Sequence, residues 1–176
     1  MSKILLDNKE FIFTEDHLPI LIHGEDHSGA SLYTITLAAH LVASGSKLIF
    51  LCGYQMAKNE YVKQVGHMDG TQFFVKEETQ EFKEALIKTG DKTIVFVKNV
   101  ELFDVEIFNI VANRKKAVIS GDISKCAFED KILNKAFNCR VLFSKLNREE
   151  LPKLNKYEGY LSSTDLQGIT ALKTLD

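Results

Sequence analysis

The sequence predicts an α/β protein, a three-layer sandwich in which helices cover both faces of a mostly parallel, five-stranded core sheet. Short apolar runs rich in β-branched and aromatic residues recur along the chain, and helical patterns lie between them. Strands buried on both faces of a parallel sheet are nearly continuous apolar runs, and their alternation with helices gives βαβ units. No linker or repeat interrupts the 176 residues, so we expect a single domain with a sizeable core.

The expected elements alternate along the chain. The five core strands are predicted at residues 19–23, 47–52, 93–97, 117–120 and 140–143. Helical spacing of apolar residues predicts helices at 31–44, 77–89, 101–113 and 125–137. Gly45 and Gly90 fit the positions just after the first two of these helices. The stretch 53–74 has the weakest pattern, with room for a helix around 59–65, and residues 73–75 are a candidate for one more strand.

The two ends of the chain are predicted to add smaller pieces to this core. Residues 1–17 hold two apolar runs separated by a polar turn, which indicates a hairpin before a core of 18–146. Residues 147–176 contain two capping boxes, at 147–150 and 164–167, and this pattern is typical of a helix start. We therefore expect C-terminal helices within the same domain.

Composition and charge restrict the class of protein. The formal net charge of −2 argues against a surface that grips nucleic acid throughout, and the one compact basic cluster, Arg114-Lys115-Lys116, is typical of a solvated helix end. The three cysteines form no CxxC pair and the five histidines lack metal-ligand spacing, so we expect free thiols and no metal site. No signal peptide and no apolar run of roughly 20 residues is visible. We expect a cytoplasmic protein without membrane contact.

A Gly-rich loop with the sequence GEDHSGAS lies between the first strand and the first helix. Its residues are Gly24, Glu25, Asp26, His27, Ser28, Gly29, Ala30 and Ser31. A phosphate-binding loop aims backbone N–H groups at phosphate oxygens, while a lysine neutralises charge and a hydroxyl holds magnesium. Both glycines and the final serine stand at the required offsets, but an alanine replaces the lysine and two acids add negative charge. Two interpretations stay open: a tight turn that only joins strand to helix, and a site that still binds nucleotide or another anion.

On these residues the chain resembles the P-loop NTPases of the RecA-like and AAA+ type, over residues 19–151. In that family the third core strand ends in an aspartate for magnesium and a glutamate that activates water. Here Lys98 and Asn99 follow the third predicted strand, and the nearest acid, Glu101, comes two places late. The resemblance therefore identifies a degenerate P-loop NTPase that lacks the lysine of the loop (Walker A) and both acids (Walker B).

Three further residues take candidate roles from the same resemblance. Ser120 and Asp122 are similar to the polar strand end that senses the γ-phosphate. Arg140 lies where some AAA+ proteins place an arginine that reaches a neighbouring subunit's nucleotide. A plain polar turn and a strand-edge arginine are the alternative interpretations of these positions.

Loss of the lysine and both acids would remove phosphate neutralisation, metal and base together, so we expect no catalytic residue and no efficient ATP hydrolysis. The first hypothesis is a catalytically inactive protein, a pseudo-ATPase, that acts as a structural or regulatory subunit of a larger assembly, such as a nucleic-acid-handling or motor assembly. The alternative is a nucleotide-binding protein, or a slow ATPase completed by a partner chain. A third hypothesis is an unrelated Rossmann-like enzyme, for which the sequence offers no catalytic set.

The resemblance also carries expectations about ligands and partners. No cofactor is certain, and ATP and ADP are the candidates. RecA-like and AAA+ domains commonly bind nucleotide at subunit interfaces, which implies a protein partner or a homo-oligomer. Nucleic acid is expected only through a partner or a local basic patch.

The position of Lys98 leads to a geometric prediction. Side chains at the C-terminal ends of parallel strands face the crevice in which ligands bind. The resemblance to RecA-like proteins implies that the third strand lies beside the first, so we expect Lys98 to point toward the loop of residues 24–31. There it either pairs with Glu25 or Asp26, or holds an anion such as phosphate or sulfate without a metal.

Overall fold

The computed structural model describes residues 3–6, 9–12, 14–25, 28–67, 69–143, 158–163 and 169–173, with side chains for 14–25, 28–67 and 69–143. It is an α/β structure whose central sheet contains six parallel strands in the order β8-β3-β7-β6-β4-β5. These strands are β3 (Ile20–His23), β4 (Leu48–Cys52), β5 (Gln72–Val75), β6 (Ile94–Lys98), β7 (Ala117–Gly121) and β8 (Cys139–Leu142). The predicted fold class is confirmed.

The parallel part has one strand more than the five expected, because β5 pairs with the outer side of β4. As an edge strand it is partly exposed: Gln72 is exposed, Phe73 and Phe74 are half-buried, and Val75 alone is buried. This mixed burial explains why its sequence pattern is weaker than that of the five central strands, all of which are buried along most of their length.

Four antiparallel strands extend the sheet beyond β8 in the order β9-β10-β1-β2. They are β1 (Lys3–Leu6), β2 (Lys9–Ile12), β9 (Glu158–Ser163) and β10 (Ile169–Lys173). The N-terminal hairpin is present, since β1 and β2 pair antiparallel over four residues each.

The helix expected after the capping box at 164–167 is wrong, because residues 169–173 form β10. A capping box satisfies only a few local N–H groups. Pairing with β9 instead joins Ile169–Lys173 to five residues opposite, from Ser162 to Glu158, and extends the sheet. The helix predicted from residue 147 lies outside the described residues.

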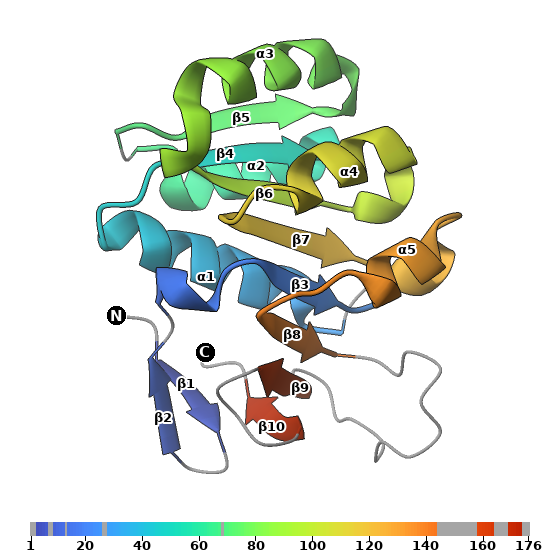
Figure 1. Cartoon of the computed structure of the whole chain (residues 1–176). Coiled ribbons are helices and arrows are strands. Elements are labelled where there is room, and N and C mark those ends of the chain that lie inside the picture. Colours follow the sequence, from blue (N-terminus) through green and yellow to red (C-terminus); the bar gives the residue numbers. More distant parts are fainter. Residues whose placement is uncertain are drawn as a thin grey trace.

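Helices cover both faces of the parallel strands (Figure 1). One face carries α1 (Ala30–Ala43) and α2 (Gln55–Val65), and the other carries α3 (Thr79–Thr89), α4 (Val105–Ala112) and α5 (Glu129–Asn134). The short 3-10 turns are η1 (Glu15–His17), η2 (Lys76–Glu78), η3 (Gly90–Lys92), η4 (Val100–Leu102) and η5 (Ile123–Lys125). Gly45 follows α1 with a φ of 90°, as its predicted C-terminal position requires.

Two helices, α4 and α5, begin four residues later than predicted. The helix expected from residue 101 begins at Val105, because the Asp104 carboxylate accepts a hydrogen bond from the Ile107 N–H at 3.2 Å and caps α4. The helix expected over 125–137 is limited to Glu129–Asn134. Residues at their expected starts form η4 and η5 instead, which matters for the site because Glu101 and Asp122 lie in or beside these turns.

The core is two apolar layers, one on each side of the sheet. Along β3, Ile20 and Ile22 belong to the layer under α1, and Leu21 belongs to the layer under α4. Phe50 on β4 anchors the first layer, with its ring centroid 4.7 to 5.0 Å from those of Tyr61, Phe73 and Phe96. The alternation along each strand therefore tells which face a side chain at the strand end will meet.

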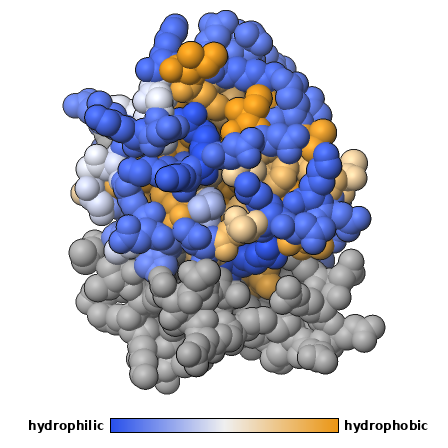
Figure 2. Space-filling view, in the orientation of Figure 1, coloured by the Kyte–Doolittle hydropathy of each residue, from blue (hydrophilic) through white to orange (hydrophobic). Residues whose placement is uncertain are grey.

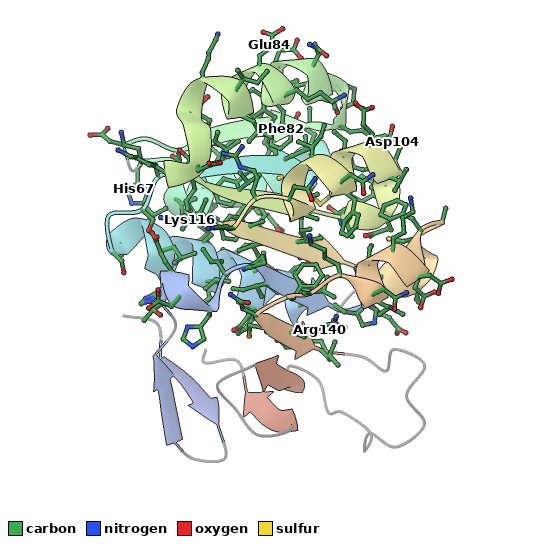
Figure 3. All side chains as sticks on the ribbon, in the orientation of Figure 1. His67, Phe82, Glu84, Asp104, Lys116 and Arg140 are labelled. Carbon is green, nitrogen blue, oxygen red and sulfur yellow. The ribbon has the colours of Figure 1, made fainter. Side chains whose placement is uncertain are left out.

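The helices expose their polar sides. Figure 3 shows Phe82 between α3 and the sheet and Glu84 on the outer side of the same helix. The face formed by α3, α4 and α5 is largely hydrophilic, with separate hydrophobic areas (Figure 2). None of the helices in the described part of the chain is both long and apolar enough to span a bilayer.

Candidate functional site

The candidate site lies at the sheet edge where β3, β6 and β7 end. Ligands of open α/β proteins bind at this carboxyl edge. The predicted strand order is wrong here: β7 lies between β3 and β6, and β3 has β7 and β8 as its neighbours. Apolar runs reveal that strands are buried, but five nearly equivalent runs contain little that specifies which pairs adjoin.

The loop after β3 is held to the sheet at its start. The Gly24 N–H donates to the Gly121 carbonyl of β7 at 3.1 Å, and the Ser28 N–H donates to the Glu25 carbonyl at 3.1 Å. A Cβ at Gly24 would lie 2.4 Å from both the Ala30 Cβ and the Ser28 Oγ, so only glycine fits. Asp26 and His27 lie outside the described residues.

The loop ends in a left-handed turn. Gly29 has a φ of 101° and is the N-cap of α1. Glycine adopts such a positive φ without the steric cost that a Cβ would bring. Because glycine has no side chain, the cap gives the first turn of α1 no side-chain acceptor.

Ala30, the first residue of α1, faces inward. It is 4% exposed and belongs to the apolar layer under α1. Its carbonyl accepts the Thr34 hydroxyl at 2.7 Å, and its N–H donates to the Ser28 Oγ at 3.4 Å. The next residue, Ser31, is exposed and borders a cavity.

The cavity lies between α1, α2 and the end of β6 and has a volume of about 480 Å³. Its lining residues are Ser31, Ile35, Tyr54, Met56, Ala57, Glu60, Tyr61, Lys98 and Asn99. Lys98 and Ser31 therefore share one cavity although a strand separates β6 from β3. The ion pair predicted between Lys98 and Glu25 or Asp26 stays a prediction.

Lys98 and Asn99 are both 8% exposed, so the cavity has polar groups in an otherwise buried place. Asn99 has a φ of 62°, a conformation that asparagine tolerates better than most residues. Its Oδ1 is buried and has no hydrogen-bond partner. Burial raises the pKa of the neighbouring Cys52 thiol to about 12, against a smaller lowering by the charge of Lys98, so this cysteine is an unreactive thiol.

A second polar cluster lies on the opposite face of the same sheet edge and consists of His23, Glu101 and Asp122. The Glu101 Oε2 accepts the Asp122 N–H at 3.1 Å, and the His23 Nδ1 accepts the Ile123 N–H at 3.0 Å. A Cβ at Gly121, where φ is 153°, would lie 2.1 Å from the same Glu101 oxygen. These contacts join η4, β7, η5 and β3 where the three strands end.

Burial has the largest single effect on the pKa of each side chain in this cluster. It lowers the pKa of His23 to about 4, despite the nearby charge of Asp122, and it raises the pKa of Glu101. Burial also acts to raise the pKa of Asp122, but hydrogen bonds from Ser124 and Lys125 outweigh it and lower that pKa. Sequence reasoning gave His23 and Glu101 no role at the site. The available signal was that His23 ends a strand and that Glu101 lies in the turn that follows one.

The residues predicted as sensors have partners within the chain. The Ser120 hydroxyl donates to the Val97 carbonyl of β6 at 3.4 Å. The Asp122 carboxylate accepts the Ser124 hydroxyl at 2.5 Å and lies 3.3 Å from the Lys125 ammonium. Their role as phosphate sensors stays a prediction.

Arg140 lies on β8 (Figure 3) and contacts α5. Its Nη2 donates to the Leu133 carbonyl at 2.9 Å and to the Lys135 carbonyl at 2.8 Å, and its guanidinium lies 5.7 Å from the centroid of the Phe137 ring. These contacts fix the end of α5. A role toward a neighbouring subunit stays a prediction.

The basic cluster at 114–116 is mostly engaged in ion pairs and hydrogen bonds. Arg114 donates to the Gly90 carbonyl, and Lys116, labelled in Figure 3, forms an ion pair with Glu15. Of the three, Lys115 is exposed and the other two are half-buried. Within the described residues, no three His, Cys, Asp or Glu side chains are grouped to hold a metal ion.

Comparisons with known proteins test the fold. No family model and no curated protein matches the sequence. The genome packaging NTPase B204 from Sulfolobus turreted icosahedral virus 2, solved with AMPPCP, has a TM-score of 0.65 at 9% identity, over 93% of this chain and 100% of that one. Its complex with sulfate gives 0.64 at 13% identity, over 93% and 99% of the two chains. The chain has a P-loop NTPase-like fold.

A third solved structure gives the same result. B204, the DNA-packaging ATPase from Sulfolobus Turreted Icosahedral Virus, has a TM-score of 0.63 at 14% identity, over 89% of this chain and 97% of that one. At such identities the likeness concerns the fold, and function has to be argued from the site.

Proposed function

We propose that this chain is a P-loop NTPase-like protein that does not hydrolyse ATP and serves as a structural or regulatory subunit of a larger assembly. The observation that carries the proposal is the buried Lys98 at the end of β6, in the cavity that Ser31 also lines. An ammonium at this place repels a divalent cation, and phosphoryl transfer in this fold depends on magnesium held near the loop.

The start of α1 supports the same conclusion. Ala30 occupies the position of the loop lysine and contributes its methyl group to the core instead of a charge to the site. Asn99, next to Lys98, is an amide where a base would be needed. The end of β6 therefore carries a lysine and an amide at the places where the resemblance puts two acids.

The nature of the assembly is proposed from the fold neighbours, which are described as genome-packaging and DNA-packaging ATPases. A non-hydrolysing copy of such a fold keeps the surfaces through which subunits associate. We propose that nucleic acid is reached through a partner protein, since Arg114 and Lys116 are engaged within the chain.

Light scattering on chromatographically purified protein tests the subunit role. We expect a mass above the 19.9 kDa of one chain, either alone or with a co-purifying protein, and no change of mass when ATP is added. A monomer at every concentration, purified from its natural source without any second chain, would contradict the proposal. Dissociation on addition of Mg-ATP would instead favour an ATPase completed by a partner.

A further inference from the structure

We propose that the groove between α1 and α2 is the contact surface for a second copy of this chain, related to the first by a two-fold axis. This inference rests on the proposed function and deepens it, because it names one partner and one surface through which a non-hydrolysing subunit would associate. The α1–α2 groove is the surface whose residues line two neighbouring cavities between these helices.

The two cavities form one continuous groove. The first is the cavity of about 480 Å³ described above, and the second has a volume of about 380 Å³. The second cavity is lined by Ser31, Leu32, Ile35, Glu60, Lys63 and Gln64. Three of these residues, Ser31, Ile35 and Glu60, also line the first. The groove therefore follows the line along which α1 packs against α2.

Exposed apolar side chains gather on the face that carries this groove. Among the described residues, the large hydrophobic side chains that are exposed are Leu32, Tyr54, Met56, Val62 and Ile87. All but Ile87 belong to α1, to α2 or to the N-cap of α2. Leu32, which lines the second cavity, is 41% exposed, and Met56, which lines the first, is 75% exposed. Apolar residues exposed together on one face are typical of an interaction site.

Glu60 and Lys63 give the groove a charge pattern that is complementary to itself. Both residues are exposed, and they lie three positions apart on α2, so they share one side of the helix. Neither belongs to an ion pair within the part of the chain that the structure describes. A two-fold axis that crosses α2 between them reverses the direction of the helix. It places Glu60 of each copy opposite Lys63 of the other and forms two identical ion pairs.

A second copy fits this pattern better than a partner of one charge sign. Nucleic acid or a strongly acidic protein would be attracted by Lys63 and repelled by Glu60, and a basic partner would meet the reverse. An antiparallel copy of α2 satisfies both charges at once. Ridges of side chains on one helix pack into the groove beside another, so α2 of each copy can occupy the α1–α2 groove of the other.

The distribution of polar and apolar groups also matches an interface. Leu32 and half-buried Ile35 provide an apolar centre, and the exposed Glu60, Lys63 and Gln64 surround it with polar groups. Protein interfaces combine an apolar centre with a polar rim in this way. Because both copies contribute the same surface, each substitution changes the interface twice.

Sedimentation equilibrium of the purified chain over a range of concentrations tests the proposal. We expect the wild type to reach twice the 19.9 kDa of one chain. Glu60→Lys and Lys63→Glu each place like charges opposite one another at two positions, and each should raise the dissociation constant of the dimer at least about tenfold. Glu84→Lys, on the outer side of α3 (Figure 3), is the matched control and should associate as the wild type does.

Mixing the two charge variants separates a specific contact from a loss of folding. A mixture of Glu60→Lys and Lys63→Glu pairs opposite charges again, so it should form dimers where each variant alone is monomeric. The double variant with both substitutions should associate with itself as the wild type does. Dimers that persist in both single variants, or a mixture that stays monomeric, would overturn the proposal.

The apolar centre has its own test. Leu32→Gln should raise the dissociation constant at least about fivefold, because two apolar side chains are removed from the interface. Ile87→Gln, an equally exposed type of residue on α3, is the control and should leave the constant unchanged. Equal dissociation constants for Leu32→Gln and the wild type would count against the groove.

A failure here is distinguishable from a failure of the proposed function. A wild type that is monomeric alone but co-purifies with a different protein overturns the second copy as the partner and leaves the subunit role in place. Hydrolysis of ATP by a chain that still forms the two-fold dimer has the opposite meaning, since it contradicts the proposed function and leaves the interface as described.

Discussion

His23 and Lys98 are the last residues of β3 and β6, at the same edge of the sheet, but their side chains lie on opposite faces of it. Lys98 follows Phe96 in the layer under α1, and His23 follows Leu21 in the layer under α4 and α5. Strand alternation therefore separates a cation that borders a cavity from a neutral imidazole that accepts the Ile123 N–H. Lys98 therefore lies at a cavity on one face, and His23 belongs to the contacts that join the strand ends on the other.

The buried imidazole makes the stability of the protein depend on pH. In the folded chain burial lowers the pKa of His23 from 6.5 to about 4, so between these values the unfolded chain binds more protons. The contribution of His23 is complete above pH 6.5 and is lost as the pH falls toward 4. We expect the free energy of unfolding to be about 2 kcal/mol lower at pH 5 than at pH 7 on account of this group.

Urea unfolding at both pH values measures the effect. His23→Asn keeps an acceptor for the Ile123 N–H and removes the titration, so its loss of stability between pH 7 and pH 5 should be smaller than that of the wild type by this amount. A variant with the same pH dependence as the wild type would mean that the pKa of His23 is the same in the folded and the unfolded chain.

Gly29 tests whether the loop is a structural turn. Its φ of 101° is unfavourable for any residue with a Cβ, and most of all for a β-branched one. Gly29→Val should lower the free energy of unfolding by about 2 kcal/mol or more, and Gly29→Asn by less, because asparagine tolerates left-handed backbone. Chemical denaturation without any ligand provides the measurement. Equal stability of all three proteins would mean that the glycine serves a ligand or has no role.

At the scale of the element, the contact between β8 and α5 explains why a strand residue matters for a helix. α5 has only six residues and ends at Asn134, and the Arg140 guanidinium binds two carbonyls at that end. Such a short helix depends on tertiary contacts rather than on its own propensity.

Replacing Arg140 should therefore destabilise the protein. Arg140→Lys cannot reach both carbonyls with the planar geometry of a guanidinium, and we expect a loss of about 1 to 2 kcal/mol. Lys131→Met, an exposed lysine on the same helix, is the control and should change stability by less than about 0.5 kcal/mol. An unperturbed Arg140→Lys would mean that the arginine is available for a neighbouring subunit.

The elements also show how much of the fold could be predicted from the sequence. The five central strands and the helices between them could be predicted, because burial on both faces produces continuous apolar runs. The sixth strand, β5, is half exposed and its pattern is weak. The strand at Ile169–Lys173 was mistaken for a helix because the capping box at 164–167 concerns only local N–H groups and does not show that the segment pairs with β9, which ends at Ser163. Strand order was missed because nearly equivalent apolar runs do not specify which strands adjoin.

At the site, too, only the features with a local sequence pattern could be predicted. The loop of residues 24–31 could be found from its glycine spacing. The contact between Glu101 and the Asp122 N–H could not, because it depends on where η4 places its carboxylate after β6 turns away from the sheet. The unpartnered Oδ1 of Asn99 likewise depends on side-chain packing that spacing does not describe.

At the scale of the whole molecule, a P-loop NTPase-like fold is combined with a site edge of unusual chemistry. The sheet joins six parallel strands to four antiparallel ones, and the strand ends that face α1 carry a lysine and an amide. With a lysine and an amide at the end of β6, the role we propose is to stabilise a state of an assembly rather than to turn over a nucleotide.

The most direct test of this account is to measure the rate of ATP hydrolysis with excess magnesium, for the purified chain and for Ser31→Ala. Ser31 is an exposed residue in the first turn of α1 and lines the cavity. The variant therefore separates hydrolysis by this protein from hydrolysis by a contaminant. The account predicts the same background rate for both proteins. A turnover of about 1 per second or faster in the wild type, abolished in Ser31→Ala, would contradict it.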